Sequence, residues 1–385
     1  MPRLEDRSTL EQPSALPMAV FLCARDTAKR NKMSRSAARA QRVQTTAAES
    51  PTYRYWEICT VPLRSPFHRF VAVVACLAGA ACGTVAHVPA GDSPALPLIV
   101  AHRGGAADYP ENTLIAIEGA LHNRADAIWL TVQLTRDGVP VLYRPADLSV
   151  NTDGQGAVAD FDLAALERLN AGWNFAPDGA GGATRYPYRD HPVRIPTLVA
   201  ALRAIPPAVP VMLDMKALPA APQADAVARV LNEENAWPRV LVYSTDGAYQ
   251  QAFAAYPQAR SRQFETRDAT RARLAAVALA HACEDPPSPE TWAAFEYARK
   301  VELVERFTLG EARSAVTAKP WTPEAIRCFR TNGETPIVAN GVDSADDYRA
   351  AACLGITAVL ADSPRKMRAI RASTALPLQC PSDAR

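Results

Sequence analysis

Charged side chains that bind anions or move protons stand at the ends of three apolar runs of the sequence. They are His102 with Arg103, then Arg144, then Asp214 with Lys216. An imidazole exchanges protons near neutral pH, a guanidinium or ammonium group binds anions, and a carboxylate binds cations. These residue types predict a polar binding site with a proton-transfer group, provided that the fold brings the three run ends together.

The elements that must position these residues follow an alternating pattern. From about Leu96 onward, β-rich runs alternate with amphipathic helical stretches. The expected strands are Leu98–His102, Ile128–Leu134, Pro140–Arg144, Val209–Lys216, Val240–Ser244, Ser261–Phe264, Ala315–Ala318, Pro336–Asn340 and Ala358–Ala361. The expected helices include Thr113–Leu121, Leu163–Arg168, Thr197–Ala204, Asp225–Asn235 and Ala345–Leu354. The Pro-rich loop at Asp285–Glu290 is expected to begin an irregular stretch that ends before Trp321.

Strands that alternate with helices predict right-handed βαβ units and a mainly parallel sheet. About eight such units in roughly 280 residues fit an α/β protein of the TIM-type (β/α)8 barrel class. A doubly wound open sheet is the alternative, but it requires a Gly-rich phosphate loop after its first strand. Here the first strand ends in His102-Arg103-Gly104-Gly105, which suits the rim of a barrel better.

The first ninety residues have a different composition. Residues 1–60 are mostly polar and are expected to be disordered, or to come from a start codon placed too far upstream. Segment 61–90 contains basic residues, an apolar run from Phe70 to Ala81, and small residues, which is the order of a secretory signal. The run is too short to span a membrane, which takes about 20 residues. A buried helix of the mature fold is the alternative interpretation.

The signal-like segment predicts export to the periplasm, the envelope or the medium. Gly79-Ala80-Ala81-Cys82 loosely matches a lipoprotein cleavage box, and a lipid anchor there would attach the protein to a membrane. Cleavage after Ala86 or Ala90 is the other option. The predicted organisation is a single barrel domain at 96–372 followed by a tail at 373–385.

Composition limits the class of protein. The formal charge of +2 and the 21% of charged residues are ordinary for a globular domain and do not indicate a nucleic-acid binder. The eight cysteines include no CxxC pair, which argues against a zinc ribbon or a thioredoxin-type site. Four cysteines lie in the part expected to be removed. The other four leave open whether they pair: Cys283, Cys328, Cys353 and Cys380.

Several short motifs, in order and spacing, resemble the glycerophosphodiester phosphodiesterase family. They are His102-Arg103-Gly104, Pro110-Glu111-Asn112-Thr113, Thr135-Arg136-Asp137-Gly138-Val139-Pro140-Val141, Arg194-Ile195-Pro196-Thr197-Leu198, Leu213-Asp214-Met215-Lys216, Val338-Ala339-Asn340 and Gly355-Ile356 through Asp362-Ser363-Pro364. The resemblance covers roughly residues 97–370. It implies a TIM barrel that hydrolyses phosphoric diesters of lipid head groups with the help of a divalent cation, Ca²⁺ or Mg²⁺. The implied partner is a small phosphodiester or phosphate ligand.

The resemblance also implies roles for individual residues. His102 corresponds to the family's general acid/base, and Arg103 to the arginine that contacts phosphate. Asp214 stands at the position of a metal-binding Glu, and Lys216 is retained beside it. Glu111 is retained too and is a second, weaker candidate for a metal ligand. Arg103, Arg144 and Lys216 are the expected phosphate-binding cations.

Three positions depart from the family pattern. Two metal carboxylates of one strand are replaced by Trp129 and Thr131, and the second catalytic histidine is replaced by Arg144. An indole offers no lone pair to a cation and a hard ion prefers anionic oxygen, so a severely weakened metal site is expected. Three nearby carboxylates could restore the metal site: Asp126, Asp137 and Asp147. Asp137 is more typical of a turn before Gly138.

Two hypotheses follow from these departures. One is a working diesterase with an altered site, in which cationic side chains supply part of the lost metal charge. The other is a catalytically degenerate barrel that binds a phosphorylated ligand or an envelope partner. Cleavage by internal cyclisation, which uses the same histidine, is a third possibility without a specific sequence cue.

Overall fold

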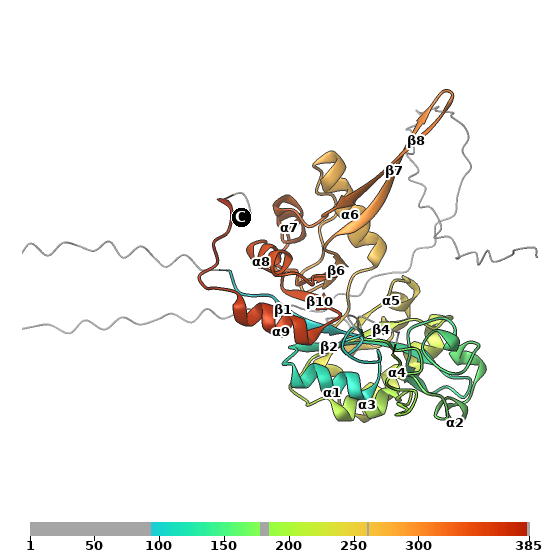
Figure 1. Ribbon diagram of the computed structural model, residues 1–385. Coiled ribbons are helices and arrows are strands. Elements are labelled where there is room, and N and C mark those ends of the chain that lie inside the picture. Colours follow the sequence, from blue (N-terminus) through green and yellow to red (C-terminus); the bar gives the residue numbers. More distant parts are fainter. Residues whose placement is uncertain (1–93, 178–184, 260–261, 383–385) are drawn as a thin grey trace, which may run out of the picture. The chain divides into compact units, whose positions relative to one another are not determined.

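The computed structural model describes residues 94–177, 185–259 and 262–382 (Figure 1). The predicted segments 1–60 and 61–90, with Cys82, Ala86 and Ala90, lie outside the described residues. The strands are β1 Leu98–His102, β2 Ala127–Leu134, β3 Pro140–Leu142, β4 Val211–Met215, β5 Val240–Tyr243, β6 Ala293–Glu296, β7 Arg299–Phe307, β8 Gly310–Ala318, β9 Ile337–Asn340 and β10 Ala358–Ala361. The α-helices are α1 Leu114–His122, α2 Leu163–Leu166, α3 Leu198–Ala204, α4 Ala220–Glu233, α5 Ala248–Phe253, α6 Arg267–Ala280, α7 Pro323–Phe329, α8 Ala345–Cys353 and α9 Pro364–Ser373.

Parallel strands form a curled sheet that closes on itself. Seven of them pair side by side in the order β5-β4-β2-β1-β10-β9-β6. Single bridges from Val242 to Gln263 and from Phe264 to Trp292 connect the two ends through the segment Gln263–Phe264. This segment takes the eighth position of the ring. The TIM-type barrel predicted from the sequence is therefore confirmed, with one of its strands reduced to two residues.

Apolar side chains fill the ring and cover its outside. The interior contains aromatic and aliphatic residues that include Val100, Trp129, Tyr243 and Phe264. Two larger clusters lie between the strands and the helices, because alternate residues of a strand point to opposite faces. In Figure 1 the helices lie on the outside of the strands. Helix starts are defined by side-chain caps, such as Thr113 at α1 and Ser363 at α9.

One part of the expected secondary structure was wrong. The segment Ala315–Ala318 is the end of β8, which pairs antiparallel with β7 in a two-stranded hairpin and not with the barrel. The stretch expected to be irregular contains the barrel strand β6 as well as this hairpin. The expected strand at Pro140–Arg144 exists as β3, but it pairs antiparallel with β2 beside the ring. β3 is thus part of an excursion between β2 and β4.

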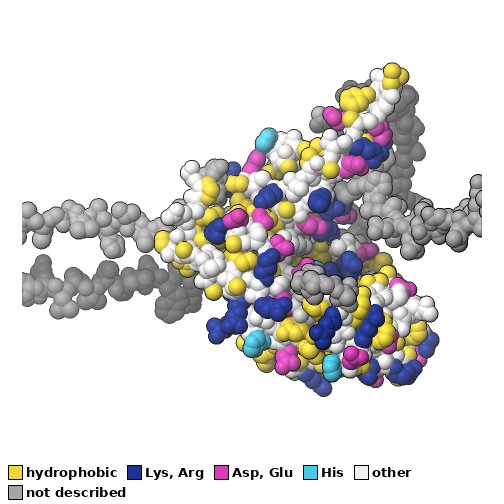
Figure 2. Space-filling model, in the orientation of Figure 1, with side chains coloured by type: hydrophobic (Ala, Val, Ile, Leu, Met, Phe, Trp, Pro, Cys, Tyr) yellow, Lys and Arg dark blue, Asp and Glu magenta, His cyan; other side chains and the backbone are white. Residues whose placement is uncertain are grey.

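The β7–β8 hairpin projects away from the barrel (Figure 1). Its tip is apolar, with Phe307 61% and Leu309 99% exposed, and Figure 2 shows hydrophobic side chains at this end of the molecule. Since β7 and β8 pair only with each other, the hairpin contributes little to the barrel core.

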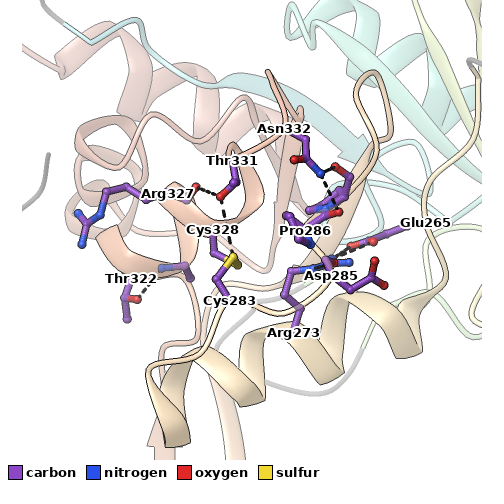
Figure 3. Close-up of a disulfide and its surroundings, with 12 residues drawn as sticks. Glu265, Arg273, Cys283, Asp285, Pro286, Thr322, Arg327, Cys328, Thr331 and Asn332 are labelled. Atoms are coloured by element: carbon purple, nitrogen blue, oxygen red, sulfur yellow. Dashed lines mark hydrogen bonds and ion pairs between the residues drawn. A yellow bond between two sulfur atoms is a disulfide. The ribbon is translucent and has the colours of Figure 1, made fainter.

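All four cysteines after residue 83 are paired. Cys283, in the loop after α6, bonds to Cys328 of α7, as Figure 3 shows. The buried Arg273 reinforces this corner by pairing with Glu265 at 2.8 Å and donating to the carbonyl of Asp285. A second disulfide joins Cys353 at the end of α8 to Cys380 in the tail that follows α9. No described helix has the length and apolar character needed to cross a membrane.

Candidate functional site

A cavity of about 430 Å³ opens at the carboxyl ends of the barrel strands, and we call it the rim cavity. The four side chains that the sequence placed in one anion pocket all line it: His102, Arg103, Arg144 and Asp214. Lys216 lines it as well. His102 is the last residue of β1, and Arg103 lies in the turn after it. Arg144 lies just after β3. Asp214 belongs to β4, and Lys216 follows that strand. Parallel strands end at one rim, which explains why residues far apart in the sequence meet here.

His102 is held by the last barrel strand. Its Nδ1 lies 2.6 Å from Oδ1 of Asp362, the residue that follows β10. The hydrogen bond from His102 lowers the pKa of Asp362, so this carboxylate stays ionised near neutral pH. An ionised acceptor at Nδ1 favours the tautomer whose proton sits on that nitrogen, which leaves Nε2 as the basic atom. The pair therefore orients an imidazole for proton transfer.

Arg103 stands in a strained turn directly after β1. Its φ of 52° lies in the left-handed region, and Gly104 and Gly105 follow with positive φ values. A Cβ on Gly104 would approach the Ala116 Cβ to 3.1 Å, so glycine lets this turn pack against α1. The guanidinium pairs with Glu111 through NH1 and donates from Nε to His102 Nε2 at 3.2 Å. The turn thus places a cation directly against the imidazole.

Asp214 and Lys216 form an ion pair in the rim cavity. The Nζ of Lys216 lies 2.9 Å from Oδ1 of Asp214, and the carboxyl is only 7% exposed. Burial raises the pKa of Asp214, while Lys216, and more weakly His102 and Trp129, act to lower it. A carboxyl with a raised pKa and a bound ammonium is a poor ligand for a hard cation.

Arg144 is exposed at the cavity and has no hydrogen bond or ion pair with any residue in the described ranges. The other lining cations are engaged: Arg103 with Glu111, and Lys216 with Asp214. Arg144 is therefore the cation most readily available to an incoming anion.

Trp129 and Thr131 occupy the positions where the resemblance implies two metal carboxylates. The indole packs inside the barrel, 4.8 Å from the ring of Tyr243 and 5.8 Å from Phe264 between centroids, and it also lines the rim cavity. Thr131 is completely buried, and its Oγ1 has no hydrogen-bond partner among the described residues. Trp129 therefore both packs in the barrel interior and shapes the rim cavity.

The side chains present do not fit the divalent cation that the resemblance implies. Glu111 pairs with Arg103, accepts from Asn151 at 3.1 Å, and lines a neighbouring cavity of about 230 Å³ that does not include Asp214. Within the described ranges, no group of three or more His, Cys, Asp and Glu side chains is arranged to hold a metal. The candidate metal ligands Asp214 and Glu111 are thus both bound to cationic side chains.

The three carboxylates that could restore the metal site form hydrogen bonds and ion pairs with other groups. Asp126 accepts from the backbone of Ile99 at 2.7 Å and pairs with Arg371. Asp137 accepts from Thr135 at 2.5 Å in the turn before β3, and Asp147 caps a 3-10 turn through Ser149. The rescue hypothesis is therefore wrong, because all three carboxylates stabilise turns or strand ends.

The sequence reasoning missed one side of the cavity. Glu296 at the end of β6 pairs with Arg267 at the start of α6, and Arg267 also donates to the Tyr243 hydroxyl at 3.4 Å. Asn340 at the end of β9 lines the cavity too. Asn340 and Asp362 lie in stretches that carried the resemblance, and their places at strand ends were the available signal. Glu296 gave no such signal, because its strand was read as irregular.

The arrangement suits the binding of an anion beside a proton-transfer group. Four cations line the cavity, Arg103, Arg144, Lys216 and Arg267, against three carboxyls, Asp214, Glu296 and Asp362. A positive, partly enclosed cavity attracts phosphate esters.

Comparison with known proteins shows the family of the chain. The model of the glycerophosphoryl diester phosphodiesterase family matches residues 102–366. An uncharacterized protein of Mycobacterium tuberculosis, Rv2277c, is 44% identical over 296 residues, which cover 77% of this chain and 96% of that protein.

Solved structures agree with the fold. The phosphodiesterase domain of Rv2277c superposes with a TM-score of 0.66 at 43% identity, covering 72% of this chain and all of that one. An Oleispira antarctica phosphodiesterase, solved in complex with the product sn-glycerol-3-phosphate, gives a TM-score of 0.53 at 20% identity, with 72% and 98% covered. The chain belongs to the glycerophosphoryl diester phosphodiesterase family.

Proposed function

We propose that this chain is a phosphoric diester hydrolase that acts on glycerophosphodiesters or related lipid head groups, with cationic side chains in place of the family's metal. The observation that carries the proposal is Arg144, which has no partner among the described residues and lines the same cavity as the His102–Asp362 pair. Arg144 stands where the family has a second histidine. It is always protonated and cannot shuttle protons, but it supplies positive charge.

In this proposal Arg144, Lys216 and Arg103 bind the phosphoryl oxygens. The phosphate draws the Arg103 guanidinium away from His102 Nε2, to which it donates in the free protein. The freed Nε2 accepts a proton from an attacking water as the water oxygen bonds to phosphorus, and it returns a proton to the alkoxide that leaves when the ester P–O bond breaks. Asp362 stabilises the imidazolium that forms in between. The arginines offset charge that develops on the phosphoryl oxygens, a role that a divalent ion performs in a metal-dependent site.

The test is a diesterase assay beside a binding measurement. Purified protein is given glycerophosphocholine with Ca²⁺, with Mg²⁺ or with EDTA, and His102→Ala is the control. We expect turnover that survives EDTA and is lost in His102→Ala. Calorimetry with sn-glycerol 3-phosphate should show binding that is insensitive to EDTA and weakened in Arg144→Ala.

The outcomes separate the two hypotheses. Binding without turnover under any condition favours the degenerate barrel, whose motivation is the replacement of two carboxylates by Trp129 and Thr131. Turnover that requires Ca²⁺ or Mg²⁺ contradicts a metal-independent site. If phosphate esters neither bind nor react, the anion pocket itself is wrong.

We also propose that the protein works outside the cytoplasm, in the periplasm, attached to the envelope or in the medium. Two disulfides among the described residues support an oxidising compartment, and the signal-like order of residues 61–90 agrees with export. Fractionation of cells that make the full chain, combined with mass measurement of its mature N-terminus, tests both this and lipidation at Cys82. Recovery in the cytoplasm with free thiols contradicts the proposal.

A further inference from the structure

We infer that the tip and one face of the β7–β8 hairpin dock on a zwitterionic phospholipid surface, while the opposite face of the hairpin stays in water. Such docking goes beyond the proposed function and is independent of it, because it involves the hairpin and no residue of the anion pocket. It accounts for an exposed apolar surface that neither the barrel core nor the rim cavity explains.

Exposed apolar side chains gather on this hairpin. Five of the eleven large apolar side chains that are exposed in the described ranges belong to residues 299–318: Leu303, Val304, Phe307, Leu309 and Val316. Leu309, in the turn between the strands, is 99% exposed (Figure 2). Single exposed apolar side chains are ordinary, whereas a cluster of them marks a surface for another protein or for a membrane.

The pairing of the two strands divides the hairpin into an apolar face and a charged face. Directly paired residues of antiparallel strands point to the same side, and successive residues alternate between sides. The apolar face contains the pairs Val301–Val316, Leu303–Ser314 and Phe307–Gly310. The charged face contains Val304 and two ion pairs, Arg306–Glu311 at 3.1 Å and Arg313–Glu302 at 2.9 Å. An element with one apolar and one ion-paired face suits a boundary between water and lipid.

A second copy of this chain fits the apolar face poorly. A standard protein interface takes about 20–30 residues and about 800 Å² from each partner, and this face offers only every second residue of two short strands. Glu305 also lies on it, between Leu303 and Phe307, and its carboxylate has no partner in the described ranges. Two apolar faces packed together would bury two such carboxylates without a cation, which is costly.

A zwitterionic phospholipid surface suits both the apolar side chains and Glu305. Glu305 precedes Phe307 by two residues, about 7 Å along the strand. Interfacial segments enter the headgroup region by roughly 5–10 Å. When Phe307 and Leu309 leave water, the carboxylate therefore stays at the level of the headgroups, where the ammonium groups of zwitterionic lipids can pair with it. An anionic surface would repel it instead.

The place of the hairpin in the barrel gives such docking a direction. β6 ends at the rim, Ala298 after it lines the rim cavity, and β7 begins at the next residue, Arg299. The hairpin then projects away from the barrel (Figure 1). A docked hairpin thus tethers the protein to lipid by the end of the barrel at which the cavity opens.

Fluorescence of an indole added at the tip tests the docking. The full chain carrying Leu309→Trp is mixed with phosphatidylcholine vesicles whose acyl chains bear bromine, a quencher of indole emission. Leu279→Trp is the matched control. Leu279 is 82% exposed near the end of α6, roughly 18 Å along the helix from Arg267 at the rim cavity. After subtraction of the wild-type emission, the added indole of Leu309→Trp should be quenched and that of Leu279→Trp should not. Quenching reports on the tip even when another segment of the chain also binds lipid.

Co-sedimentation with vesicles assigns the affinity to individual side chains. Phe307→Ser/Leu309→Ser should bind phosphatidylcholine vesicles at least about tenfold more weakly than wild type, because two apolar side chains no longer leave water. Leu279→Ser should bind like wild type. Glu305→Gln should bind phosphatidylglycerol vesicles more tightly than wild type does, because the variant lacks the repelled charge.

Several results would overturn the docking. Unquenched emission from Leu309→Trp, or equal sedimentation of wild type and Phe307→Ser/Leu309→Ser, rules out the lipid surface as the partner. Tighter binding of wild type to phosphatidylglycerol than to phosphatidylcholine overturns the zwitterionic assignment. A doubled mass in light scattering that is lost in Phe307→Ser/Leu309→Ser assigns the apolar face to a second copy of the chain. The proposed hydrolysis is unaffected by any of these results, since its assay uses a soluble diester.

Discussion

At the scale of single residues, the site differs from a metal-dependent one by the sign of its charge. Trp129 and Thr131 stand where the resemblance implies two carboxylates, and Arg144 places a permanent cation at the rim. The remaining carboxyl at this place, Asp214, is paired with Lys216, and its burial raises its pKa. Each change moves the cavity toward direct binding of an anion.

The His102–Asp362 pair leads to a prediction of how the free energy of unfolding depends on pH. The folded pKa of Asp362 lies below the unfolded value of about 3.9, so its stabilising contribution is present above that pH and is lost as pH falls through the folded pKa. Asp362→Asn should lower the free energy of unfolding at pH 7 by less than about 1 kcal/mol, because the side chain is largely exposed.

Urea unfolding of wild type and Asp362→Asn at a series of pH values measures this difference. The two curves should converge as pH falls from about 3.9 through the lower, folded pKa of Asp362, since the wild-type carboxyl then becomes protonated as well. Asp346→Asn is a suitable control, since this aspartate pairs with Arg349 on the exposed face of α8, away from His102. A difference in the free energy of unfolding between Asp362→Asn and wild type that widens toward low pH would contradict the role of Asp362 as an ionised partner of His102.

Trp129 carries a prediction about stability. Its indole is 2% exposed and contacts Tyr243 and Phe264 inside the barrel. Trp129→Ala should destabilise the protein by about 3–5 kcal/mol, as expected for a large aromatic side chain lost from a core. Trp129→Phe keeps a ring in the cluster and should cost clearly less. Chemical unfolding measures both, and a loss below about 1 kcal/mol for Trp129→Ala would show that the indole is not packed as described.

The sequence predicted the residues of the site that follow well-formed strands. His102, Arg103, Arg144, Asp214 and Lys216 meet in one cavity as expected, because the carboxyl ends of barrel strands share a rim. The partner of His102 was not predicted, since Asp362 lies 260 residues away and nothing local marks the contact. The place of Glu296 in the cavity depends on the pairing of β6 with β9, which its local sequence does not indicate.

At the scale of elements, most barrel strands were predictable from their apolar runs, including the short β5 and β10, whereas β6 was not. β1 reads Leu-Ile-Val-Ala-His and matches its expected bounds, whereas β6 reads Ala-Ala-Phe-Glu and has weak strand propensity. Its neighbour in the ring is a segment of two residues, Gln263–Phe264, held by single bridges. Ring closure, and not local preference, makes these segments extended.

The exposed β7–β8 hairpin leads to the prediction that the stability of the barrel does not depend on it. Its strands pair only with each other and most of its side chains are exposed, so it adds little to barrel stability. Lys300 and Thr317 are partners across the hairpin. Replacing residues 301–316 by Asn-Gly, a turn that suits a two-residue loop, should change the melting temperature by no more than about 3 °C.

A thermal melt followed by circular dichroism checks the shortened chain. The control is the double variant Phe307→Ser/Leu309→Ser, which keeps the hairpin and removes its exposed apolar tip. It should melt like wild type. A fall of more than about 10 °C in the shortened chain would mean that the hairpin supports the barrel.

At the scale of the whole molecule, the barrel is closed by contacts between distant parts of the chain. β1 pairs with β10, so the first and last strands of the ring are neighbours. The turn after β1 is bound to the start of α9, where Asp108 accepts from Ser363 at 2.7 Å. These contacts fix the His102 end of the site to the Asp362 end, so loss of ring closure would separate the two residues.

The two disulfides give the last prediction, because they constrain different parts of the molecule. Cys283–Cys328 joins the loop after α6 to α7 in the barrel wall, across 45 residues of sequence. Cys353–Cys380 joins α8 to the tail, across 27 residues. In the chain-entropy account each should contribute roughly 3–4 kcal/mol by restricting the unfolded chain.

The tail past α9 buries little beyond Leu378, and without its disulfide it can detach while the barrel stays folded. The detached tail gains conformational entropy in the folded protein, and this gain offsets part of the stability that is lost with the disulfide. The double variant Cys283→Ser/Cys328→Ser should therefore be destabilised by about 2–4 kcal/mol, and Cys353→Ser/Cys380→Ser by clearly less. Chemical unfolding of both variants beside wild type measures the difference, and an equal or larger loss for the tail pair would show that the tail is part of the folding unit.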